Sequence, residues 1–310
     1  MGKYLVTGVA GFIGAAVATA LVQDGHEVTG LDNLSTGFRA NVPRGVVFFE
    51  GNCEDAAVYR ECLAGREFDA IFHIAGQSSG EVSFDDPVHD LRTNAESTLH
   101  LLTFALKTGC RRFLYASSMS VYGVKPDAPV RENSDAVPQS FYGVGKLASE
   151  HYLRLYEHYG IRSTCLRLFN VYGPGQNMIN MRQGMVSIYM AMMLEHGHIH
   201  VKGSPDRFRD FVYIDDVVAA FLACLAHPGS AGRVINIGGS GKVRVGDLVE
   251  KLRGLSPSPV TVEYSGSTAG DLHGIYADRS LAGECLGYRP SVSLEEGLAR
   301  MYAWCVGRTG

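Results

Sequence analysis

The segment TGVAGFIG, at residues 7–14, constrains the fold of this chain more than any other stretch. It follows a short apolar run and leads into a segment in which Ala, Leu and Val recur at helical spacing until Gly25. A glycine-rich turn between a strand and a helix lets backbone N–H groups approach a diphosphate at the helix N-terminus. The sequence therefore predicts a dinucleotide-binding unit whose loop contains three glycines, in the less frequent G-x-x-G-x-x-G spacing: Gly8, Gly11 and Gly14.

Short apolar runs and helical patterns alternate through the first half of the chain. Near-continuously apolar strands that alternate with helices are typical of a parallel sheet covered on both faces, so we predict an α/β fold. We expect a dinucleotide-binding domain over residues 1–166, to which part of 212–240 returns, and a mainly substrate-binding domain over 167–310. Besides the strand at 4–8, the predicted strands are 27–32, 46–51, 70–76, 112–118 and 233–239, and the clearest helical patterns are at 94–109 and 143–159.

Charge and hydropathy argue against several classes of partner. The net charge is −4, which provides no basic field for nucleic acid or an anionic membrane. Apolar runs such as 217–226 are too short to span a bilayer, and the N-terminus lacks the pattern of a signal peptide. The seven cysteines are scattered without a CxxC pair, which favours reduced thiols over disulfides or a metal site. We expect a cytoplasmic protein without a metal.

Asp32 ends the second predicted strand at the distance from the glycine loop that a dinucleotide site requires. A carboxylate there accepts hydrogen bonds from the adenosine ribose hydroxyls and repels a 2′-phosphate, so Asp32 favours NAD over NADP. Arg39 lies nearby in the sequence and is the one residue that weakens this choice.

A tyrosine and a lysine four residues apart occur in SFYGVGKLASE: Tyr142 and Lys146. On a helix, residues i and i+4 share a face, so the ammonium can lie beside the phenol. A nearby cation lowers the pKa of a phenol and makes it a usable general base. The pair therefore predicts proton transfer at this helix.

These motifs together resemble the extended short-chain dehydrogenase/reductases that act on nucleotide-sugars, and most closely their 4-epimerases of the UDP-glucose type. The resemblance rests on TGVAGFIG, LDNLSTG, ASSMSVYG, YGVGK, RLFNVYGPGQ and RDFVYIDDV, and it extends from residue 3 to about 300. It implies a Rossmann doubly wound sheet with a smaller C-terminal domain, tightly held NAD and a UDP-sugar substrate. It also implies a homodimer, for which the apolar faces of the helices at 94–109 and 143–159 are candidates, although these faces could equally pack against the sheet.

The resemblance implies roles for individual residues. Ser118 corresponds to the hydroxyl beside Tyr142 at the sugar 4-oxygen, and Lys146 also holds the nicotinamide ribose. Asn94 corresponds to an asparagine near the nicotinamide, and Asn52 stands where an aspartate usually contacts adenine. The full predicted cofactor set is Gly8, Gly11, Phe12, Ile13, Gly14, Asp32, Asn33, Asn52, Ala75, Gly76, Gln77, Asn94, Tyr142 and Lys146.

Predicted substrate contacts come from several segments. Asn170 and Arg209 match positions that bind the nucleotide diphosphate, and Asp271 matches an acid near the nucleotide ribose. Thr268 stands where relatives often have an arginine, so one phosphate contact is missing or supplied elsewhere. Polar residues at the carboxyl ends of two predicted strands complete the set: Ser78, Ser79, Ser118 and Ser120.

The residues after the strand at 112–118 discriminate between reactions. Related dehydratases carry an acid pair at the positions of Met119 and Ser120, and methionine cannot transfer a proton. Epimerisation at carbon 4 through a transient 4-keto sugar is therefore the leading hypothesis. Glu81 keeps a dehydratase with non-standard acids open, and a non-catalytic NAD-binding regulator is a third alternative.

Overall fold

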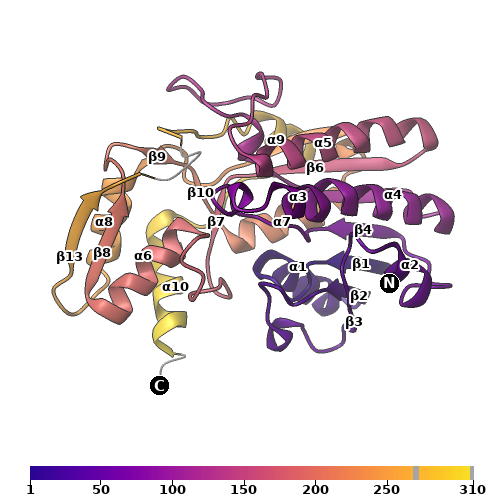
Figure 1. The fold of residues 1–310 in the computed structure, drawn as a ribbon, viewed down its shortest axis with the longest axis horizontal. Helices are drawn as coiled ribbons and strands as arrows, with labels where there is room; N and C mark the ends of the chain where they lie inside the picture. Colours follow the sequence, from indigo (N-terminus) through magenta and orange to yellow (C-terminus); the bar gives the residue numbers. More distant parts are fainter. Residues whose placement is uncertain (268–271, 308–310) are drawn as a thin grey trace.

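Seven parallel strands form the central sheet, six from the first 168 residues and one, β11, from later in the chain (Figure 1). The computed structural model describes residues 1–267 and 272–307. The spatial order β3-β2-β1-β4-β5-β6-β11 reverses direction between β1 and β4, which creates a crevice at the carboxyl ends of these strands. The strands are β1 (Lys3–Thr7), β2 (Glu27–Asp32), β3 (Val47–Glu50), β4 (Ala70–His73), β5 (Arg112–Ser118), β6 (Arg162–Leu168) and β11 (Arg233–Ile237).

Alternation of side chains along the strands divides the core into two layers. Leu5 and Ile71 pack into one buried cluster, whereas their neighbours Val6 and Phe72 pack into another. The first cluster is covered by α2 (Ala56–Glu61), α4 (Ser97–Thr108) and α5 (Phe141–Tyr156). The second is covered by α1 (Phe12–Gln23), α7 (Ile214–Ala226) and α9 (Ser280–Leu286). The predicted α/β class, with a doubly wound parallel sheet, is confirmed.

Smaller sheets and three helices build the C-terminal part, which lies beside the carboxyl end of the central sheet (Figure 1). A separate hydrophobic cluster holds together α6 (Met185–His196), α8 (Val245–Arg253) and α10 (Leu294–Gly307). The paired strands are β8 (His198–Lys202) with β13 (Thr261–Ser265), β7 (Asn170–Tyr172) with β10 (Phe211–Tyr213), and β9 (Phe208–Arg209) with β12 (Val243–Arg244).

Two predicted elements differ from the observed ones near the sheet crevice. The strand predicted over 70–76 ends at His73, because the chain turns away at Gly76, whose φ is +145°. The helix predicted over 94–109 continues a longer helical run: α3 (Pro87–Leu91) and a π-helical turn at Arg92–Glu96 precede α4. Over the described residues, no helix combines the length and apolar character that crossing a membrane requires.

Candidate active site

The glycine loop leaves no room for a side chain at Gly8 or at Gly14. A methyl group on Gly14 would lie 2.0 Å from the carbonyl oxygen of Gly8, and one on Gly8 would lie 2.8 Å from the nitrogen of Ala75. Gly8 also has a φ of +73°, in the left-handed region that favours glycine. Helix α1 begins after Gly11 without a side-chain cap, so its first-turn N–H groups can receive a diphosphate.

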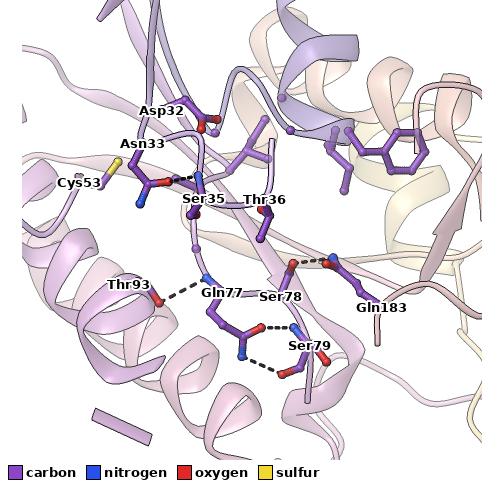
Figure 2. A pocket seen from close by; sticks show the side chains of 18 of the residues that line it. Asp32, Asn33, Ser35, Thr36, Cys53, Gln77, Ser78, Ser79, Thr93 and Gln183 are labelled. Atoms are coloured by element: carbon purple, nitrogen blue, oxygen red, sulfur yellow. Dashed lines mark hydrogen bonds between the residues drawn. The ribbon is translucent and has the colours of Figure 1, made fainter. Parts of the chain in front are cut away.

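A cavity of about 450 Å³ lies beside this loop (Figure 2). The predicted cofactor residues that line it are Gly8, Gly11, Phe12, Ile13, Gly14, Asp32, Asn33, Ala75, Gly76 and Gln77, and the predicted substrate residues Ser78 and Ser79 line it as well. Residues that the sequence reasoning missed include Ser35, Thr36, Cys53, Thr93, Gln176, Asn177, Asn180 and Gln183. Ser35 and Thr36 belong to LDNLSTG and Gln176 ends RLFNVYGPGQ, so these three could have been found there, whereas 177–183 carries no local signal for this contact.

Asp32 braces the loops on both sides of the cavity. Its Oδ2 accepts a hydrogen bond from the backbone nitrogen of Ala10 at 2.9 Å, and its Oδ1 accepts one from Leu34 at 2.8 Å. Arg39 does not line the cavity, because its guanidinium stacks 4.2 Å above the Phe48 ring. The uncapped helix, the glycine cradle and the Asp32 carboxylate together fit NAD.

Asn52, which is exposed, and Asn94 are predicted cofactor residues that do not line the cavity themselves. Asn52 accepts a hydrogen bond on Oδ1 from Asn33 Nδ2 at 2.7 Å, between the lining residues Gly51 and Cys53. Asn94 is fully buried, and its Nδ2 donates to the carbonyl oxygen of Gln77 at 3.0 Å. Both side chains therefore brace residues that line the cavity.

Tyr142 and Lys146 occupy the first turns of α5, directly below the end of β5. Ser140 caps this helix by accepting a hydrogen bond from the Gly143 nitrogen at 3.1 Å. Lys146 Nζ donates to the carbonyl oxygen of Ala116 at 2.9 Å and lies 5.7 Å from the Tyr142 ring centroid. Ser118 lies near enough to the Tyr142 phenol to lower its pKa.

Burial shifts the proton affinities of both groups. Desolvation raises the pKa of Tyr142 to about 12, although the Ser118 hydrogen bond lowers it, and the charge of Asp90 raises it further. Desolvation lowers the pKa of Lys146 to about 8, against the opposing charges of Asp90 and Glu150. The two pKa values, which nearly coincide in water, are thus driven apart, so that without a bound cofactor the phenol holds its proton more tightly than the ammonium does.

A second cavity of about 240 Å³ adjoins the first, and Gly76, Ser78 and Gln176 line both. Its polar walls come from β5, α5, β7 and the segments that follow β4 and β5. The predicted polar residues among them are Ser78, Ser118, Ser120, Tyr142, Lys146 and Asn170. No carboxylate lines it within residues 1–267 and 272–307. Glu81 lies outside both cavities, where it pairs with Arg182 at 3.5 Å and Lys202 at 3.8 Å.

Of the predicted diphosphate and ribose contacts, Asn170 lines the second cavity whereas Arg209 lines neither cavity. Arg209 is buried and lines neither cavity; its guanidinium donates to the carbonyl oxygens of Phe208 and Leu272, each at 2.7 Å. Asn170 lines the second cavity and donates to the carbonyl oxygen of Asp210 at 3.0 Å. Asp271 and Thr268 lie outside the described residues.

A Rossmann sheet, an uncapped glycine loop and a buried Tyr-Lys helix define the class of this protein as a dinucleotide-dependent enzyme of the short-chain dehydrogenase/reductase type. Residues 4–238 match the model of the NAD dependent epimerase/dehydratase family. The chain belongs to this family, and NAD is its cofactor.

Named relatives span nearly the whole chain. It is 35% identical to the UDP-glucose 4-epimerase of Mycolicibacterium smegmatis, over 96% of both chains. It is 30% identical to the UDP-glucuronate 4-epimerase of Thermodesulfobacterium geofontis, over 98% of this chain and 96% of that one. The solved UDP-glucose 4-epimerase of Thermotoga maritima, with UDP-glucose, superposes with a TM-score of 0.93 at 34% identity, covering 99% of this chain and 100% of that chain.

Proposed function

We propose that this protein interconverts the two configurations at carbon 4 of a UDP-hexose, through a transient 4-keto sugar. The observation that carries the proposal is the second cavity. It brings Tyr142, Lys146 and Ser118 together beside the cofactor cavity, and no carboxylate among the described residues lines it. This cavity supports proton transfer at the sugar 4-oxygen. It does not offer the carboxylate acid and base that an elimination of water requires.

Tyr142 is the proposed proton acceptor for the sugar 4-hydroxyl. When bound, NAD supplies the reversible hydride acceptor for carbon 4, and its positive charge favours an ionised phenol. Ser118 lines the same cavity as the phenol and is the proposed second contact of this sugar oxygen. Lys146 contributes a cation close to the Tyr142 ring. Once the keto sugar has rotated in the cavity, carbon 4 would regain the hydride on its opposite face, and Tyr142 would return the proton to the 4-oxygen.

The sugar itself is proposed to be uncharged at carbon 5. Lys146 is the one cationic side chain among the described residues that line the second cavity, and it is already bonded to the carbonyl of Ala116. A hexuronate would bring a carboxylate that requires its own donors. This supports UDP-glucose and UDP-galactose over UDP-glucuronate. Asn170, Arg209 and Asp271 remain the proposed contacts of the nucleotide diphosphate and ribose.

A panel of nucleotide-sugars tests this function. The purified protein is incubated with UDP-glucose, UDP-N-acetylglucosamine, UDP-glucuronate and dTDP-glucose, and products are followed by sugar NMR and mass spectrometry. Epimerisation gives a galacto-configured product of unchanged mass without added cofactor, with UDP-glucose turned over faster than UDP-glucuronate. A product lighter by one water would overturn the proposal in favour of a dehydratase. Tight NAD binding without turnover of any sugar would favour the regulator.

We also propose that the protein forms a homodimer, that it is cytoplasmic, and that its two domains meet near residue 166. Exposed apolar side chains on α3 and α5 support a dimer through this face: Val88, Leu91, Val144 and Leu155. Light scattering during gel filtration tests it, and a Val144→Glu, Leu155→Glu variant is expected to run as a monomer. A wild-type protein that is monomeric at micromolar concentration would contradict the dimer.

A further inference from the structure

Asp90 is a buried carboxylate next to the catalytic helix that the proposed reaction does not use. Its side chain belongs to α3 and is 1% exposed. Oδ1 accepts hydrogen bonds from Gln77 Nε2 at 2.8 Å and from Asn94 Nδ2 at 3.3 Å. Oδ2 has no hydrogen-bond partner within the part of the chain that the structure describes. A buried carboxylate oxygen in this state is expensive unless a nearby charge compensates it.

The partnerless oxygen faces the helix that carries Tyr142 and Lys146. A methyl group built on Gly145 would lie 3.3 Å from Asp90 Oδ2, so this oxygen meets the backbone of α5 one residue before the lysine. The other oxygen is held by Gln77, which lines the cofactor cavity. Asp90 therefore connects the wall of one cavity to the proton-transferring residues of the other.

We propose that Asp90 is a positioning residue that supplies the buried countercharge of Lys146 and holds Gln77 at the cofactor cavity. This inference rests on the proposed roles of Tyr142 and Lys146. The negative charge of Asp90 acts on both groups, because it stabilises the ammonium of Lys146 and disfavours the phenolate of Tyr142. Asp90 touches no reacting atom in this scheme.

The electrostatic surroundings agree with this assignment. The charge of Asp90 is the largest influence that opposes the desolvation of Lys146, ahead of Glu150, and it also raises the pKa of Tyr142. Burial raises the pKa of Asp90 itself, and hydrogen bonds and the charge of Lys146 oppose that rise. The remaining titratable or charged groups around these two are His73, His89, Tyr115, Glu150 and, paired with Glu150, Arg167.

Removal of the negative charge should move both proton affinities in the same direction. Without it the ammonium of Lys146 is lost at lower pH, and the phenol of Tyr142 ionises at lower pH. Both limbs of the pH–activity profile then shift toward acid, on the order of one pH unit for a charge at this range. A merely structural role would lower activity without displacing the profile.

Asp90→Asn is the decisive variant, because the amide keeps an oxygen for Gln77 and Asn94 but carries no charge. Asp216→Asn is its matched control: Asp216 is also buried, accepts hydrogen bonds from Ser291, and lines neither cavity. The pH profiles of kcat and kcat/KM are measured on the holoenzymes. We expect the acid shift in Asp90→Asn alone. An unshifted profile, or an equal shift in the control, would overturn the proposal.

A second measurement needs neither substrate nor turnover. The ultraviolet phenolate titration of each protein is compared with that of its Tyr142→Phe derivative, which isolates the ionisation of Tyr142. We expect the phenol to ionise at lower pH in Asp90→Asn than in the wild type. In Asp90→Glu, which keeps the charge, it should ionise at the wild-type pH, and this variant also serves if Asp90→Asn folds poorly. Titrations that coincide in Asp90→Asn and the wild type would refute the inference. Loss of the proposed reaction would leave this readout intact, so the two failures are distinguishable.

Discussion

The two adjoining cavities are built on different principles. The cofactor cavity takes most of its wall from three short segments that each follow a strand: 8–14, 32–36 and 74–79. The substrate cavity gathers residues from β5, α5, β7, the start of α6 and β10. The first depends on backbone geometry, because glycines let N–H groups reach the ligand. The second depends on side chains whose proton affinities burial has altered.

Tyr142→Phe should impair the chemistry in the substrate cavity and leave the cofactor cavity intact. It should have the largest effect on turnover. Loss of a positioned acid-base group lowers kcat by about 10²–10⁴-fold. Retention of NAD should stay at the wild-type level, since the glycine loop and Asp32 are unchanged. Steady-state kinetics and the NAD content of the purified protein check both halves. Turnover within a few-fold of the wild type would exclude Tyr142 as the base.

Gly14→Ala should impair NAD binding in the cofactor cavity. The added methyl meets the carbonyl oxygen of Gly8 at 2.0 Å, so the loop must shift, at a cost of about 1–3 kcal/mol. We expect NAD binding to weaken by roughly 10- to 100-fold in calorimetry.

Gly229→Ala is the matched control, because a methyl there meets none of the described residues within 4 Å. Equal NAD affinity in the two variants would show that the close approach at Gly14 does not shape the site.

Acid should destabilise the sheet beneath the cofactor cavity through His73. Burial lowers the pKa of His73 to about 3, and its ring bonds Thr7 and Thr98. A pKa that is lower in the folded than in the unfolded state gives stability above about pH 6.5 that is lost as the pH falls toward 3. Between pH 7 and 5 this group should account for about 2 kcal/mol of lost unfolding free energy.

Denaturant unfolding at both pH values measures this loss, with His73→Gln as the comparison. Parallel losses in the two proteins would contradict the assignment to His73.

Glu81→Gln should have the smallest effect and sharpens the boundary of the substrate cavity. Because Glu81 pairs with Arg182 and Lys202 outside both cavities, turnover should stay within about threefold of the wild type, as expected for an exposed ion pair. The product should have the same mass. Loss of activity would instead place Glu81 in the chemistry.

Much of the fold was predictable because its signals are local. The strands expected at 27–32 and 112–118 coincide with β2 and β5 residue for residue. The role of Asn94 was harder, because the sequence suggested a cofactor contact whereas the side chain is buried behind Gly76 and Gln77. Gln176 and Gln183 were missed since they reach the cofactor cavity from a loop about a hundred residues after its other walls.

The sequence by itself determined the glycine loop, the carboxylate after β2 and the Tyr-Lys pair, because each acts through neighbours in the chain or one helical turn away. Tertiary structure decided the charges around them. In the folded chain Glu81 pairs with Arg182, Arg39 stacks on Phe48 instead of lining the cofactor cavity, and Asp90 lies against the backbone of α5. Proton affinities depend on burial and on charges from distant segments, and only the folded chain brings these together.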